Sequence, residues 1–210
     1  MNFYPAILIP LAVFTPLFYL NWNRIDKIVD ESLFARFLLF GLLLGVVYVV
    51  MFLYSFFVLD QYIDLMLFSI MLFLPLLSAG EQLSVMSGKY KTRKDLIQLS
   101  TSLGGAFSFP VSFAIAIVTA PSMLNYAFIA LVTLFAFITN VVSSAVLSMG
   151  VTKRKVLLYY NFAFLVQMLF SSSIFIEYLY GSYAMITIIP EIGVAILLYM
   201  RFIHARTGIS

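Results

Sequence analysis

The feature that most constrains the fold is a series of seven apolar segments, each of about 17–25 residues, the length of a membrane-spanning helix. At about 1.5 Å per residue, such a helix crosses about 30 Å of hydrocarbon. A backbone surrounded by lipid must satisfy its own hydrogen bonds, which excludes open strands. We therefore expect an all-α, polytopic helical membrane protein with a single membrane domain over residues 1–210. The expected helices are 3–20, 34–58, 62–79, 98–119, 123–148, 156–178 and 183–202.

The composition agrees with a membrane protein and argues against several kinds of site. Hydrophobic residues make up 63% of the chain and charged residues 10%, against about 45–50% and about 25% in soluble domains. The absence of Cys excludes disulfides, thiolate metal sites and a Cys nucleophile, and the single histidine, His204, cannot form a multi-histidine site. No phosphate-binding Gly-rich loop or Ser–His arrangement is present. We expect no enzyme, metal or cofactor, and the small net charge of +3 does not indicate nucleic-acid binding.

The basic residues alternate between the connections of the expected helices. Every second connection contains Lys or Arg, and the connections between them are acidic or neutral. Under the positive-inside rule this pattern predicts an outside N-terminus, a cytoplasmic C-terminus and a basic cytoplasmic loop at 80–97. The twelve basic residues are Arg24, Lys27, Arg36, Lys89, Lys91, Arg93, Lys94, Lys153, Arg154, Lys155, Arg201 and Arg206.

Two features near the N-terminus add detail to this topology. The first segment contains three prolines and no basic N-terminal region, so we expect a signal anchor or a kinked first helix rather than a cleaved signal peptide. In residues 21–33, Trp22, Ile25, Val29 and Leu33 recur at helical spacing, and charged residues occupy the other face. This pattern favours an interfacial amphipathic helix, and a solvated linker is the alternative.

Glu191 is the one acid placed deep in an expected helix, near the middle of the last segment. Counting back through the hairpin formed by the last two helices brings Ser171 and Ser172 to the same depth, with Gln167 one turn further on. These side chains can hydrogen-bond the carboxyl group. Asn140 and Asn161 lie nearer the cytoplasmic side and extend the polar residues into a seam. Two interpretations remain open: a substrate or ion path, or a protonated Glu that joins helices by hydrogen bonding.

Small residues predict close helix packing at two places. The sequence "GLLLG" at 41–45 is a small-xxx-small motif, which lets another helix approach closely. Gly104 and Gly105, followed by Pro110, favour a similar approach in the segment 98–119.

The stretch "LFLPLLSAGEQLSVMSGKYKTRKDLIQLSTSLGGAFSFPVSFAIAI" resembles the region between the second and third helices of ABC-2-type transporter permeases. In that family a membrane helix ends in an acid and then a glycine, and a basic pair opens the next span. Here Glu81, Gly88 and the pair Arg93–Lys94 match. Two features depart from the pattern. Thr92 stands where a proline usually precedes the basic pair, and the first helix lies outside the family's six-helix plan.

This resemblance implies a separate cytoplasmic ATPase as partner, because the family's cytoplasmic segment docks on one. It also implies a six-helix core over 21–203 with both ends inside the cell. The residues expected at the docking surface are Glu81, Lys91, Arg93, Lys94, Lys153, Arg154 and Lys155.

A second resemblance competes for the same residues: "SGKYKTRKDLIQLSTSLGGAFSFP" is also similar to the Yip1-type membrane domain, in which a Gly- and Lys-rich loop precedes a proline-containing span. The later "GVTKRKVLLYY" would match that family's basic segment before its last helix. The domain has five spans, so this resemblance leaves the first and last helices of the chain unassigned.

The functional expectation is a permease-like subunit of a transport system in the cell membrane, of ABC-2 type, surrounded by lipid and part of a homo- or hetero-oligomer. One alternative is a non-transport membrane protein, either a Yip1-like organiser or an accessory subunit of a larger complex. A second alternative is an ion-coupled carrier or channel that uses Glu191.

Overall fold

The computed structural model describes residues 4–22, 29–59, 61–88, 90–91, 95–119, 123–181 and 184–202. Within these ranges the protein is all-helical, with 92% of the residues in helices and no strand. Five of the helices are long and apolar enough to cross a membrane. The elements are α1 (Tyr4–Trp22), α2 (Glu31–Phe57), α3 (Ile63–Phe68), η1 (Ser69–Phe73), α4 (Leu74–Ser87), α5 (Leu96–Val118), α6 (Met123–Thr152), α7 (Val156–Tyr180) and α8 (Ala184–Phe202).

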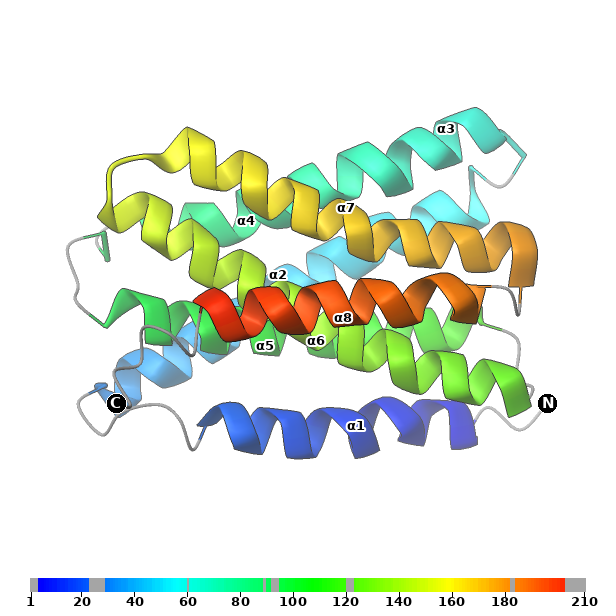
Figure 1. The fold of residues 1–210 in the computed structure, drawn as a ribbon, viewed down its shortest axis with the longest axis horizontal. Helices are drawn as coiled ribbons and strands as arrows, with labels where there is room; N and C mark the ends of the chain where they lie inside the picture. Colours follow the sequence, from blue (N-terminus) through cyan, green and yellow to red (C-terminus); the bar gives the residue numbers. More distant parts are fainter. Residues whose placement is uncertain are drawn as a thin grey trace.

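The long helices lie side by side along one axis and alternate in direction (Figure 1). Helix α6 is the centre of the bundle, because it packs against α1, α4, α5, α7 and α8. One end of the bundle, where α1, α4, α6 and α8 finish, carries all basic side chains of the described residues, and we call it the basic end. We call the other the opposite end. The described basic residues are Arg36, Lys91, Lys153, Arg154, Lys155 and Arg201.

Helix α2 shows how the bundle separates its core from its surroundings. Its buried face includes Phe37, Tyr48 and Phe52, whereas Leu43 and Val50 on other faces are exposed. Apolar residues therefore cover both the inner and the outer side of the helix, as expected where the surroundings are lipid rather than water.

The glycines of α2 allow the close approach that the sequence predicted. A Cβ atom on Gly41 would overlap the backbone oxygen of Leu103 on α5, and one on Gly45 would meet the backbone oxygen of Phe107. Gly104 in turn lies directly against the backbone of Asn140 on α6. Small residues at these positions therefore hold α2, α5 and α6 at short range.

The helix that begins at residue 63 extends further than the apolar pattern indicated. It was expected to end at residue 79, but it continues without interruption through α3, η1 and α4 to Ser87. A single Gly80 does not stop a helix, and the chain leaves helical geometry only at Gly88. Glu81 therefore lies inside the helix rather than in a loop. Within this continuous helix, η1 has π-helical rather than α-helical geometry, which nothing in the sequence indicated.

The remaining helices begin and end within a few residues of the apolar segments. Helix α2 starts at Glu31, where the Asp30 side chain caps it by accepting a 2.9 Å hydrogen bond from the backbone N–H of Ser32. Residues 23–28 of the expected amphipathic helix at 21–33 lie outside the described residues, as do Arg93 and Lys94 of the expected docking loop.

Candidate functional site

Three buried amide side chains meet in the middle of the bundle, one each from α4, α6 and α7. Gln82 is 0% exposed, Asn140 1% and Gln167 2%. The Asn140 side-chain oxygen accepts two hydrogen bonds, from Gln167 Nε2 at 2.8 Å and from Gln82 Nε2 at 3.2 Å. Ser144 Oγ donates to Gln82 Oε1 at 2.6 Å, and Gln82 Nε2 also donates to Ser78 Oγ at 3.3 Å. We call these five residues the amide cluster.

Asn140 is the hub of the amide cluster. Its own amide nitrogen donates to the backbone oxygen of Ala136 at 2.8 Å, which fixes the orientation of the side chain on α6. Its oxygen is thereby directed at Gln82 and Gln167 on the two neighbouring helices. A hydrogen bond between membrane helices contributes on average about 0.6 kcal/mol, whereas a buried amide without partners costs about 1–3 kcal/mol. The cluster therefore selects one register of α4, α6 and α7.

Further polar groups extend this level of the bundle toward α2. The buried side chain of Tyr48 on α2 lies near Ser171 on α7. Glu81 stands beside Gln82 on α4, and one of its carboxyl oxygens is buried without a hydrogen-bond partner in the described part of the chain. This oxygen is an acceptor that the described residues leave unused.

Glu191 and Ser172 form a second polar contact, between α8 and α7. Ser172 Oγ lies 3.0 Å from Oε1 of Glu191, as the depth count along the hairpin predicted. The same hydroxyl lies 2.7 Å from the backbone oxygen of Leu169. One hydroxyl hydrogen serves one acceptor at a time, so a proton on Glu191 would allow both contacts to be hydrogen bonds. The other carboxyl oxygen is buried and has no partner among the described residues.

The structure divides the polar residues predicted from the sequence into separate groups. Asn140 and Gln167 are bonded to each other, while Ser172 belongs to the contact with Glu191 and Ser171 to the contact with Tyr48. Asn161 is exposed on α7 and lines an apolar groove against α6, apart from the amide cluster.

Sequence reasoning missed Gln82 and Ser78, which complete the amide cluster from α4. Gln82 was overlooked because the helix was expected to end at residue 79, and without Gln82 the serine at position 78 had no polar neighbour on its helix face. Their spacing of four residues, matched by Asn140 and Ser144 on α6, is the signal that marks one polar helix face.

The basic end presents a compact turn between α6 and α7. Lys153, Arg154 and Lys155 are all exposed there. Arg154 has a φ of 58°, and the N–H of Lys155 donates to the backbone oxygen of Gly150 at 2.9 Å. This is the bonding pattern of a helix C-terminus that usually has glycine at the left-handed position. Lys91, the other described residue of the expected docking surface at this end, is also exposed.

Among the described residues, no group of His, Cys, Asp or Glu side chains could hold a metal ion. No family model matches the chain, and neither a curated protein nor a solved structure matches it. The fold therefore defines only a class of protein: an all-helical protein whose apolar helices are compatible with a multi-pass membrane protein.

Proposed function

We propose that the chain spans the cell membrane seven times, with the start of α1 outside and the end of α8 in the cytoplasm. Two observations support seven spans over five. Helices α1 and α8 have 19 residues each, about 28 Å at 1.5 Å per residue, and both lie alongside the longer helices (Figure 1). The gathering of the described basic side chains at one end supports the orientation, because cytoplasmic loops are rich in Lys and Arg.

Within this topology, we propose that the protein is a permease-like subunit of a transport system, of ABC-2 type. One observation carries this proposal. The middle of the bundle holds acid oxygens at Glu81 and Glu191 that have no partner among the described residues. Ionisable residues at membrane depth are costly, and they commonly mark a substrate or ion path. Glu81 lies next to the amide cluster, so the path would pass along α4 and α7.

The basic end would couple this subunit to a separate cytoplasmic ATPase. Lys153, Arg154 and Lys155 form an exposed tip, and Arg154 occupies a left-handed backbone position that glycine would occupy with less strain. The presence of Arg at such a position supports a role for its side chain in binding. Acidic side chains on a partner would complement this tip.

Copurification tests the coupling. The tagged full chain is extracted from native membranes in mild detergent, and the copurified ATP hydrolysis is measured and its source identified by mass spectrometry. We expect an ATPase with the wild type and its loss when Lys153, Arg154 and Lys155 are all replaced by Glu. Arg201→Glu, at the same end but on α8, is the matched control and should retain the ATPase. A wild-type complex without an ATPase would overturn the proposal.

A second function, an organiser or accessory subunit of a membrane complex, is favoured by a different observation. The amide nitrogens of the cluster all have partners, as expected for residues that hold helices together rather than bind a ligand. A tight copurifying complex that contains no ATPase would support this second function.

A further inference from the structure

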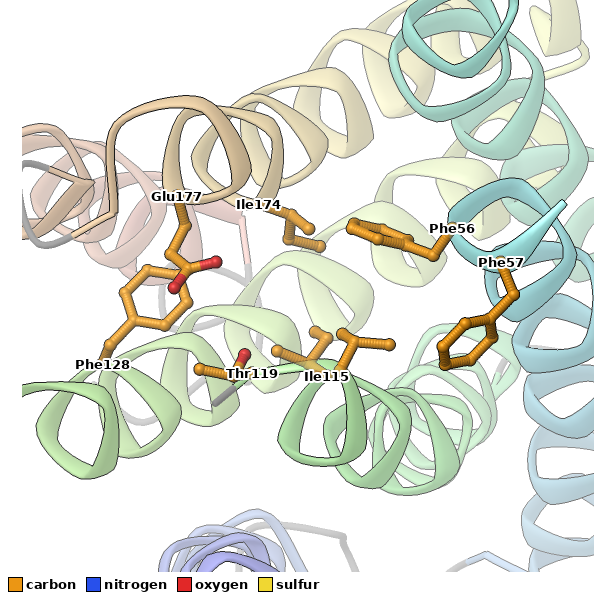
Figure 2. A pocket seen from close by; sticks show the side chains of 8 residues that line it. Phe56, Phe57, Ile115, Thr119, Phe128, Ile174 and Glu177 are labelled. Atoms are coloured by element: carbon orange, nitrogen blue, oxygen red, sulfur yellow. The ribbon is translucent and has the colours of Figure 1, made fainter. Parts of the chain in front are cut away.

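A pocket of about 230 Å³ lies at the opposite end of the bundle, between α2, α5, α6 and α7 (Figure 2). Phe56 and Phe57 of α2 and Phe128 of α6 contribute aromatic rings to its wall. Thr119, directly after α5, and Glu177 of α7 contribute its hydroxyl and carboxyl groups. Aliphatic side chains complete the lining, so the pocket is an apolar chamber with one acid.

The side chain of Glu177 points from α7 into the space between the helices, and Thr119 faces it from the other side (Figure 2). No described residue forms an ion pair with Glu177. The connections at this end, residues 58–62, 119–123 and 181–183, contain no Lys, Arg or His. A carboxylate in apolar surroundings is costly unless a cation compensates it. Where Glu177 is ionised rather than protonated, its compensating charge must therefore come from outside these parts of the chain.

We propose that this pocket binds an ammonium group carried on an apolar body. The carboxylate of Glu177 supplies the opposite charge, and the Thr119 hydroxyl supplies a second oxygen acceptor. The rings of Phe56, Phe57 and Phe128 supply aromatic faces, which attract organic cations. Apolar walls around a single anionic group fit a ligand that is itself apolar around a single cationic group.

The side chains of the lining favour an organic cation over a metal ion as the occupant. Ca²⁺ takes about six to eight oxygen ligands and Mg²⁺ requires near-octahedral geometry. The side chains that line the pocket offer only the carboxyl group of Glu177 and the hydroxyl group of Thr119. An ammonium group needs fewer oxygen partners, because aromatic faces also stabilise it.

The size of the pocket limits the part of the ligand that enters it. A volume of about 230 Å³ lies below the range of about 300–1,000 Å³ for sites that enclose drug-sized molecules. The pocket therefore takes a head group with a few carbon atoms. The rest of the ligand would extend past Phe57, whose side chain is 69% exposed.

Two sources could supply this chemistry. Phe57 and Val118 are the last residues of α2 and α5, and Glu177 lies in the last turn of α7. In the seven-span arrangement these helix ends lie at the level of lipid head groups. The ammonium group could therefore belong to phosphatidylethanolamine or to a free lipophilic amine.

The test uses the full chain in maltoside micelles, which contain no ammonium group. Hexyltrimethylammonium is titrated by calorimetry, with hexanol as the uncharged probe of similar chain length. Glu177→Gln removes the charge from the pocket. Asp64→Asn is the matched control, because Asp64 is an exposed acid at the same end of the bundle and does not line the pocket. We expect binding of hexyltrimethylammonium to the wild type and to Asp64→Asn. Glu177→Gln should bind about tenfold more weakly or worse, because a charge-assisted contact is lost.

A second arm identifies the source of the ammonium group. Wild type and Glu177→Gln are purified from membranes that contain phosphatidylethanolamine and phosphatidylglycerol, and native mass spectrometry measures the lipid that each retains. Selective retention of phosphatidylethanolamine by the wild type identifies a lipid ligand. Binding of hexyltrimethylammonium without such retention identifies a free amine.

If Glu177→Gln fails to fold, Phe57→Ala decides the question, because this exposed ring can be removed with little effect on the core. It should weaken hexyltrimethylammonium binding by about two- to fivefold through loss of an aromatic face. Equal binding of hexyltrimethylammonium and hexanol to the wild type would overturn the proposal. Unchanged binding in folded Glu177→Gln, or in Phe57→Ala where Glu177→Gln does not fold, would also overturn it.

Discussion

The amide nitrogen of Gln167 donates a 2.8 Å hydrogen bond to the side-chain oxygen of Asn140. This contact joins α7 to α6, and both side chains are buried. The same oxygen accepts a hydrogen bond from Gln82 on α4. Apolar packing alone discriminates weakly between registers of membrane helices, because lipid is as apolar as their side chains. A shared acceptor specifies the register, since a shift of either neighbour by one turn would leave amides unpaired.

Asn140→Leu should therefore destabilise the bundle more than the loss of one hydrogen bond would. The substitution removes the shared acceptor, so Gln167 Nε2 has no partner among the described residues and Gln82 Nε2 keeps its longer bond to Ser78. A buried polar group left unpaired costs about 1–3 kcal/mol. We expect a total loss of about 2–4 kcal/mol, measured by SDS-induced unfolding in mixed micelles. Ser148→Ala is the control, because among the described residues that buried hydroxyl bonds only to Ala145 of its own helix. Equal losses for the two variants would contradict the role of Asn140 as a hub.

Substitutions of Glu191 separate its hydrogen bond from its proton. Gln keeps an oxygen acceptor for Ser172, so Glu191→Gln should unfold within about 0.5 kcal/mol of the wild type, whereas Glu191→Leu should lose about 1 kcal/mol. If Glu191 carries an ion or proton, transport by Glu191→Gln should lose its dependence on pH. Unchanged transport or complex function between about pH 5 and 8 would leave only a packing role.

The helices and the contact between Ser172 and Glu191 could be predicted from the sequence. Both follow from counting residues, along the apolar segments in the first case and along the two arms of the hairpin in the second. Apolar segments long enough to span lipid indicated the helices, and the hairpin turn aligned Ser172 with Glu191 by counting residues. The close approach at Gly41 was also predictable, since small residues at this spacing have few other uses in a membrane helix.

The amide cluster could not be predicted in the same way. Its members come from three helices, and their meeting depends on which helices are neighbours and which face each one buries. A soluble helix shows its buried face through alternation of polar and apolar residues. Here both faces are apolar, so the weak four-residue spacing of Asn140 and Ser144 was the one sequence feature that separated buried Asn140 from exposed Asn161.

Gly41→Ala should weaken the packing of α2 on α5. The added Cβ would overlap the backbone oxygen of Leu103, which cannot move without displacing α5. We expect a loss of about 1–3 kcal/mol in the same unfolding assay. Gly193→Ala on α8 is the matched control, because no atom lies within 4 Å of the added carbon. It should be neutral or stabilising by up to about 1 kcal/mol through helix propensity. A destabilised Gly193→Ala would show that the effect is not specific to the α2–α5 contact.

Arg154→Gly should stabilise the turn at the basic end while it weakens partner binding. A left-handed residue with a side chain costs about 1–2 kcal/mol, which glycine avoids. We expect a gain of up to about 1 kcal/mol in unfolding and less copurified partner. Arg154→Ala removes the same charge but keeps the strained backbone, so it should lose binding without gaining stability. If Arg154→Gly keeps full binding, the side chain is not part of the docking surface.

Single-cysteine labelling tests the proposed orientation directly, because the chain contains no native cysteine. Tyr62 at the opposite end and Lys153 at the basic end are both exposed, so a cysteine at either position should be reactive where the reagent can reach it. With an outside N-terminus, Tyr62→Cys should react with an impermeant maleimide in intact cells. Lys153→Cys should react only after the cells are permeabilised. The reverse pattern would place the basic end outside and remove the cytoplasmic ATPase as a partner of the tip at Lys153–Lys155.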